Sequence, residues 1–183
     1  MARIATLIHN MMEFWKSPHG WAPFEAAELL NKSMLEWQSS LARSLSKWTG
    51  PLSDGELILA WANIGALVEG QLKLFLSAYY NDYVADAESI KRNGIVQDPD
   101  GVSLEPLRVF FSKRIWSPEQ TWDAWILQIQ QRRNAIHAFK AKDIGTSDEL
   151  HAALRTLLLF IRDMNSMLPY PEMYEPSEYE YQR

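Results

Sequence analysis

Apolar residues recur at the three- and four-residue spacing of helices along most of this 183-residue chain. The spacing is clear in residues 23–48, 117–140 and 146–168, and a shorter stretch, 106–114, is compatible with another helix. Residues 53–79 are apolar on most sides, which is typical of a central, buried helix. We therefore predict an all-α fold, an up-and-down bundle of about five helices.

Helix boundaries are signalled by capping residues. Pro23 suits the first position of a helix, and Gly50 followed by proline is a stop signal. Ser53–Glu56 and Ser117–Gln120 have the form of capping boxes, the second with proline at the first helical position, and Thr146–Glu149 caps the last helix. Each cap contributes about 1 kcal/mol to helix stability, so these starts are the best-defined boundaries.

Residues 90–105 interrupt the helical pattern. Two short apolar runs, Ile95–Gln97 and Val102–Leu104, flank the sequence Asp98-Pro99-Asp100-Gly101. Proline, glycine and aspartate in this order favour a turn. We expect a small hairpin or an ordered loop inserted into the helical protein.

The chain divides into one body and a tail. Residues 1–168 form a single predicted domain, because the length suits one core and we find no internal repeat. Residues 169–183 hold three prolines, four tyrosines and four glutamates without apolar periodicity. We expect this tail to be extended or disordered and to contribute little to the core.

The amino-acid composition excludes several kinds of functional site. The chain has no cysteine, which excludes disulfides and thiolate sites and fits a cytoplasmic protein. The spacing of histidine, aspartate and glutamate residues does not resemble that of a metal-binding motif. No cofactor-binding motif is present either. The longest apolar run is too short for a bilayer, and the N-terminus lacks the apolar block of a signal peptide. We expect neither metal, nor cofactor, nor membrane association.

Charge is unevenly distributed. The net charge is −5, which argues against a general nucleic-acid coat. Residues 91–142, however, contain nine Lys or Arg against five Asp or Glu, a local net charge of +4. This segment either presents a positive face to a polyanion or is a set of solvated helix faces without a partner.

The most informative stretch is Arg132 to His137, late in the predicted helix over 117–140. An imidazole transfers protons near pH 7, and a guanidinium holds a phosphate in a two-pronged grip. On an ideal helix Arg133 and His137 lie about 40° apart, and Arg132 and His137 about 140° apart. Arg133 is thus the easier partner of His137 in one chain, and Asn134 suits orienting a neighbour. The alternative is an exposed basic helix end, which the helix dipole favours.

With its Arg132-x4-His137 spacing near the end of a helix, followed by a further helix, the chain resembles the HEPN superfamily. The resemblance implies a helical, metal-independent ribonuclease of a toxin–antitoxin or anti-phage type that dimerises to form a shared cleft. The motif arginine stays open, because spacing favours Arg132 and the Arg-Asn step favours Arg133. Glu69 in the central helix either faces this cluster or is a paired carboxylate.

The resulting hypothesis is a cytoplasmic endoribonuclease with RNA as substrate. His137 is the predicted general acid and base, Arg132 and Arg133 bind phosphate, and Asn134 orients the group. We expect a homodimer, with a protein partner or antitoxin possible. The alternatives are a non-catalytic HEPN-like module that binds RNA, a nucleotide or a protein, and a helical interaction protein whose tail docks elsewhere.

Overall fold

The computed structural model describes residues 1–19, 22–137, 139, 141–171, 174 and 176–179. This part of the chain is mostly helical, as predicted, with eight α-helices and one two-stranded sheet. The α-helices are α1 (Ala2–Trp15), α2 (Phe24–Lys32), α3 (Leu35–Ser44), α4 (Asp54–Ala78), α5 (Tyr80–Ala85), α6 (Leu104–Arg114), α7 (Trp122–Arg133) and α8 (Ser147–Ser166). Short 3₁₀ turns are η1 (Leu45–Lys47), η2 (Pro99–Gly101) and η3 (Asn134–His137), and the strands are β1 (Lys91–Arg92) and β2 (Ile95–Val96).

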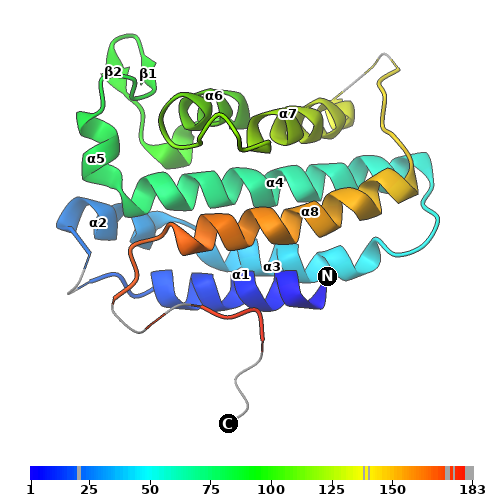
Figure 1. Ribbon diagram of the computed structural model, residues 1–183, viewed down its shortest axis with the longest axis horizontal. Coiled ribbons are helices and arrows are strands. Elements are labelled where there is room, and N and C mark those ends of the chain that lie inside the picture. Colours follow the sequence, from blue (N-terminus) through cyan, green and yellow to red (C-terminus); the bar gives the residue numbers. More distant parts are fainter. Residues whose placement is uncertain (20–21, 138, 140, 172–173, 175, 180–183) are drawn as a thin grey trace.

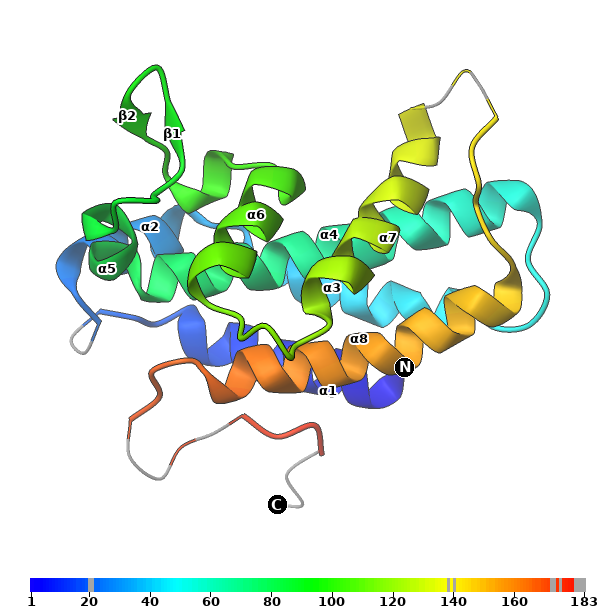
Figure 2. The same cartoon turned by 45° about the horizontal axis from the view of Figure 1, so that its top comes forward.

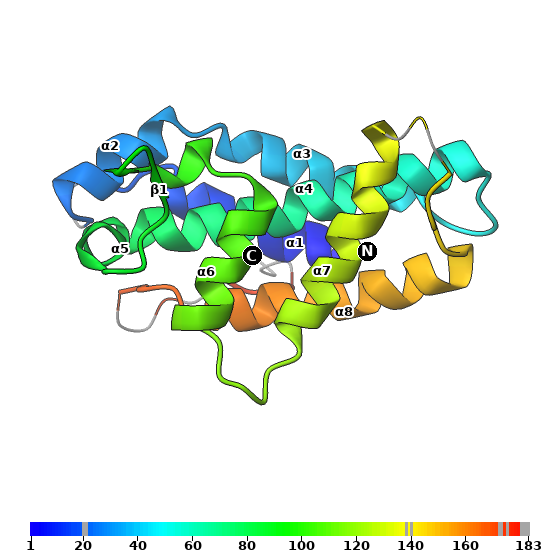
Figure 3. The same ribbon diagram turned by 90° about the horizontal axis from the view of Figure 1, so that it is seen from above.

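Helix α4 is the centre of the molecule (Figure 1). It contacts α2, α3, α6, α7 and α8, and α1 packs on α3 and α8. Helices α1, α3, α4 and α8 run roughly alongside one another, whereas α6 and α7 cross α4 obliquely (Figures 2 and 3). The apolar character of α4 on most sides is therefore explained by its contacts with neighbouring helices on several sides.

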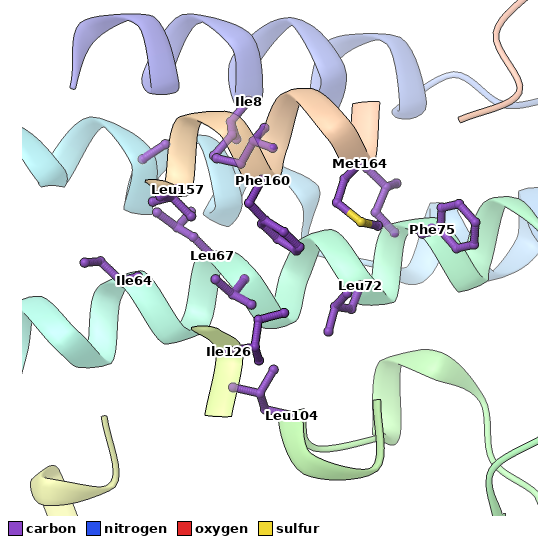
Figure 4. Close-up of a cluster of buried hydrophobic side chains, with 14 of the residues drawn as sticks. Ile8, Ile64, Leu67, Leu72, Phe75, Leu104, Ile126, Leu157, Phe160 and Met164 are labelled. Carbon is purple, nitrogen blue, oxygen red and sulfur yellow. The ribbon is translucent and has the colours of Figure 1, made fainter. Parts of the chain in front are cut away.

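The core lies where α4, α8 and α1 meet, with α6 and α7 closing it from the other side. Figure 4 shows Ile8 of α1 close to Phe160 of α8, whose ring points toward α4, the helix that carries Leu67. All three side chains have no exposed surface. Burying one such side chain stabilises a fold by about 1.5–3 kcal/mol, so this contact region holds the helices together.

Of the three predicted capping sequences, two begin a helix and one does not. Capping boxes with both reciprocal hydrogen bonds begin α4 at Ser53 and α8 at Thr146. Helix α7, in contrast, begins at Trp122 and not at Pro118. Gln120 does bond back to the backbone nitrogen of Ser117, but its side chain also donates to Asp163 of α8, as does Trp122. These contacts hold residues 117–120 in a turn against α8.

The predicted helix over 23–48 is divided in the structure. Helix α2 ends at Lys32 because Ser33 adopts an extended backbone, and α3 starts at Leu35. The N-terminal helix α1 was not predicted, although its buried side chains have helical spacing: Ile4, Leu7, Ile8, Met11, Met12 and Trp15. The division of residues 23–48, the unpredicted α1 and the separate α5 explain why the structure has more helices than predicted.

A hairpin is present in the insertion, but its turn lies earlier than predicted. The strands pair antiparallel, with Arg92 opposite Ile95. Asn93 and Gly94 form the turn with φ of 55° and 80°, and Asn-Gly is the preferred pair for such a turn because both positions need positive φ. The Asp98–Gly101 segment instead becomes the 3₁₀ turn η2, and Val102–Leu104 is not a strand.

The described part of the tail has no helix or strand, in keeping with the expected extended segment. It is not detached from the body, however. Glu178 pairs with Arg162 of α8 and with Arg3 of α1, and Pro176 is buried. These contacts tie the described part of the tail to two helices, whereas the expectation that the tail contributes little to the core stays a prediction.

Candidate functional site

The segment from Arg132 to His137 lies at the junction of α7 and η3. Helix α7 ends at Arg133, and Asn134–His137 forms the 3₁₀ turn. The sequence predicts an α-helix that continues to residue 140, so its end is placed too late; Ala138 and Lys140 lie outside the described residues. A 3₁₀ turn winds more tightly than an α-helix, and the two arginines before it contact different partners.

Arg132 is held inside the protein. Its exposed fraction is 5%, its Nη2 donates to Glu149 Oε1 at 2.7 Å, and its Cζ lies 4.8 Å from the centre of the Trp61 ring. Hydrogen bonds from Arg132 and from the Thr146 backbone lower the pKa of Glu149, so the carboxylate stays charged at neutral pH. Arg132 thus joins the end of α7 to the capping box of α8.

Gly145 makes room for this arrangement. A β-carbon at this position would lie 2.6 Å from Cζ of Arg132, and the backbone φ of +66° is one that side-chain-bearing residues rarely adopt. The residue therefore serves both the turn before α8 and the guanidinium beside it. The burial and pairing of Arg132 are typical of a residue that stabilises the fold.

Arg133 projects toward α4. Its Nη1 donates to Glu69 Oε2 at 2.7 Å, and its side chain is 28% exposed. Gly65 of α4 lets the two helices approach, because a β-carbon there would lie 2.5 Å from Cδ of Arg133. Arg133 therefore reaches across α4 while keeping access to solvent.

A groove of about 360 Å³ opens beside Arg133. Small residues of α4 form part of it, and α3 and η3 contribute from either side. Its lining consists of Gln38, Ala62, Ala66, Glu69, Gly70, Lys73, Arg133, Ile136 and His137. Arg133 and His137 are thus brought to one groove, as their separation of about 40° on an ideal helix suggested.

Glu69 links the charges of this groove. Its second oxygen, Oε1, pairs with Lys73 Nζ at 2.9 Å, while Oε2 accepts from Arg133. Burial raises the pKa of Glu69, but hydrogen bonds from Lys73 and Arg133 outweigh that effect, and the pKa lies below its ordinary value. The carboxylate is therefore charged at neutral pH, and Arg133, Lys73 and Glu69 together carry a net charge of +1.

We expect Glu69 to contribute to stability in a pH-dependent way. Because its pKa is lowered in the folded protein, its contribution is present above the ordinary value of 4.5 and is lost as the pH falls through the folded value. The difference in the free energy of unfolding between wild type and Glu69→Gln should thus be largest near neutral pH and shrink below pH 4.5. Urea titrations from pH 7 to acid measure it; a constant difference would contradict the ion-pair account.

His137 and Gln38 also line this groove. His137 is exposed, and within the residues that the structure describes its side chain makes no hydrogen bond. Gln38 packs over Gly70, and its Oε1 is buried without a hydrogen-bond partner in the described chain. The imidazole, which is open to solvent, is available to a ligand, and the Gln38 side chain lines the same groove.

Asn134 lies on the other side. It lines a separate pocket of about 490 Å³ with Arg132 and Lys142, together with Gln128, Gln131 and Asp143. The four predicted site residues therefore divide into two pairs, Arg133 with His137 and Arg132 with Asn134. Of the other groove residues, Glu69 was considered from its sequence position, whereas Lys73 and Gln38 were not predicted. The four-residue Glu69–Lys73 spacing could have indicated Lys73, whereas nothing local to Gln38 points to the groove.

No protein-family model, curated protein or solved structure matches this chain. The resemblance to the HEPN superfamily thus stays a prediction from the sequence. In the part of the chain that the structure describes, no helix combines the length and apolarity needed to cross a membrane. Within those same residues, no three His, Asp or Glu side chains converge as metal ligands would.

Proposed function

We propose that the groove between α3, α4 and η3 is the site of a metal-independent endoribonuclease. The observation that carries this proposal is that Arg133 and His137 line the same groove, with Lys73 beside them. Arg133 would be the motif arginine, while Arg132, buried against Trp61, would have a structural role. Asn134 would then not act in this groove.

Metal-independent cleavage of RNA needs a general base, a general acid and a cation. His137 would remove the proton of the ribose 2′-hydroxyl, whose oxygen attacks the adjacent phosphorus. The bond from phosphorus to the 5′-oxygen breaks, and this leaving oxygen takes up a proton. Arg133 and Lys73 would stabilise the negative charge that develops on the phosphate oxygens. The products are a 2′,3′-cyclic phosphate and a 5′-hydroxyl, and water can open the ring to a 3′-phosphate.

One observation favours a second candidate, a module that binds RNA or a nucleotide without cleaving it. Arg133 already has a carboxylate partner, Glu69, at 2.7 Å. A phosphate must share or displace that contact, which weakens its hold on the guanidinium. Binding through the Gln38 side chain and the exposed imidazole would still be available under this alternative.

Cleavage of labelled RNA tests the proposal directly. Purified protein is incubated with RNAs of varied sequence, with and without EDTA, and the product ends are analysed by mass spectrometry. We expect cutting that persists in EDTA and leaves 2′,3′-cyclic or 3′-phosphate ends, because the acid–base steps use side chains of the chain itself. DNA of the same sequence should stay intact, since it lacks the 2′-hydroxyl. Tight RNA binding without cutting would favour the second candidate.

We also expect the protein to form a two-fold dimer through the region of α7 and η3. A single His137 supplies one proton-transfer group, and a second copy would provide the other. Apolar side chains are exposed there, among them Phe139 at 107% and Ile136 at 46%. Light scattering at micromolar concentration should give twice the 21.2 kDa chain mass, and Ile136→Glu should reduce it. A monomer that nevertheless cleaves RNA would contradict a shared cleft.

The biological setting in this proposal follows from the HEPN resemblance alone. It comprises a toxin or anti-phage role, the cytoplasm, and an antitoxin or other protein partner. The exposed apolar surface near η3 is one place where such a partner could bind in place of a second copy.

A further inference from the structure

Residues 176–179 of the tail are bound like a peptide ligand by two helices of the body. Arg162 of α8 donates to both carboxylate oxygens of Glu178, at 2.5 and 2.6 Å. Arg3 of α1 pairs with the same carboxylate. The Glu178 side chain is only 10% exposed, so this group is enclosed by cations from two helices. A two-pronged arginine contact of this kind selects a carboxylate by geometry as well as charge.

The same helices also bind the backbone of this segment. Asn10 of α1 donates its Nδ2 to the carbonyl of Ser177 at 2.7 Å, and Asn165 of α8 donates to the carbonyl of Pro176 at 3.3 Å. Asn165 is 3% exposed. Side-chain amides that bond successive carbonyls hold an extended chain in one register, much as a sheet edge holds an added strand.

The residue after the glutamate is recognised as well. The hydroxyl of Tyr179 accepts a hydrogen bond from Arg3 at 2.9 Å, and Cζ of Arg3 lies 5.2 Å from the centre of the tyrosine ring. Four consecutive residues, Pro176 to Tyr179, are thus bound through two carbonyls, one carboxylate and one ring. All of these contacts come from α1 and α8, on the side of α4 away from α6 and α7 (Figure 1).

We propose that the face formed by α1 and α8 is a peptide-binding site for an extended Pro-Ser-Glu-Tyr segment, and that its ligand in trans is the tail of a second copy. The tail can leave without unfolding the core, because the arginines that hold it are partly open to water, at 48% for Arg3 and 39% for Arg162. Ion pairs of partly exposed side chains contribute only about 0–1 kcal/mol each. Every copy carries the sequence that fits the site, so exchange between copies needs no other partner.

The chain's own tail competes with any added peptide. A tethered ligand acts at an effective concentration of about 1 mM, so the wild-type site is nearly filled. Glu178→Ala in the full-length protein removes the group that both arginines hold and opens the site. We therefore expect a labelled peptide of residues 174–183 to bind Glu178→Ala at least tenfold more tightly than it binds wild type.

Fluorescence anisotropy with that peptide tests the inference. Glu178→Ala should bind it, whereas Glu178→Ala combined with Arg162→Ala should bind at least tenfold more weakly, since a charged hydrogen-bonded pair is lost. A peptide with alanine at the position of Glu178 should show the same loss. Glu88→Ala, which removes an exposed carboxylate paired with Lys113, is the control and should behave as wild type.

Three outcomes would overturn the inference. The first is no binding to a folded Glu178→Ala protein at millimolar peptide. The second is equal binding of a scrambled peptide, which would indicate charge attraction alone. The third is a loss of folding in both Glu178→Ala and the milder Glu178→Gln, seen by circular dichroism, because a tail needed for folding cannot exchange. None of these outcomes depends on RNA cleavage.

Discussion

Replacing His137 by alanine is expected to slow RNA cleavage by about 10²–10⁴-fold, the usual contribution of a general acid or base. The side chain is exposed at the edge of the groove, so its removal should leave the thermal midpoint nearly unchanged. Cleavage of a labelled RNA under single-turnover conditions gives the rate, and circular dichroism checks the fold.

His9→Ala is the matched control for this variant. His9 is also exposed, and its helix, α1, contributes no residue to the groove. It should cut RNA at the wild-type rate. If His137→Ala cuts as fast as wild type, the activity belongs elsewhere in the protein or to a contaminant, and the proposed role of the imidazole is wrong.

The two neighbouring arginines are expected to give opposite results. Arg133→Ala should reduce cleavage by about 10²–10³-fold, comparable to the loss of one charge-stabilising donor, with a small effect on stability. Arg132→Ala should lower the thermal midpoint by about 4–8 °C, because a desolvated cation stacked on an aromatic ring contributes about 2 kcal/mol. The remaining folded Arg132→Ala protein should retain most of its activity.

Thermal unfolding and single-turnover cleavage, measured on the same preparations, separate these effects. Arg155→Ala removes an exposed arginine from α8 and serves as the control for both readouts. A large loss of cleavage in folded Arg132→Ala, with normal cleavage in Arg133→Ala, would reverse the assignment of the motif arginine. It would also move the candidate site to the pocket that contains Asn134.

The two surfaces proposed for binding lie on different sides of α4. The groove proposed to bind RNA is formed with α3 and η3, and the proposed tail site is formed by α1 and α8. Neither shares a lining residue with the other. Variants of one surface are therefore suitable controls for the other, which keeps a failure of the RNA proposal distinct from a failure of the peptide proposal.

The helical class of the fold follows from the sequence alone. The spacing of apolar residues and the reciprocal side-chain bonds at Ser53 and Thr146 are local properties, and the structure confirms both caps. The apolar surface of residues 53–79 likewise predicts a central helix, which α4 is. Local signals are weaker where a contact from a distant helix intervenes, as at Ser117–Gln120, where Asp163 holds the turn.

The sequence also identified the stretch that carries the candidate chemistry, but it could not decide between Arg132 and Arg133. That choice depends on Glu149, Trp61 and Glu69, which are distant in the chain. Spacing places side chains on the face of one helix, whereas burial and pairing depend on what packs against that face. Only the tertiary structure therefore placed Arg132 in the interior, and Arg133 in a groove with His137.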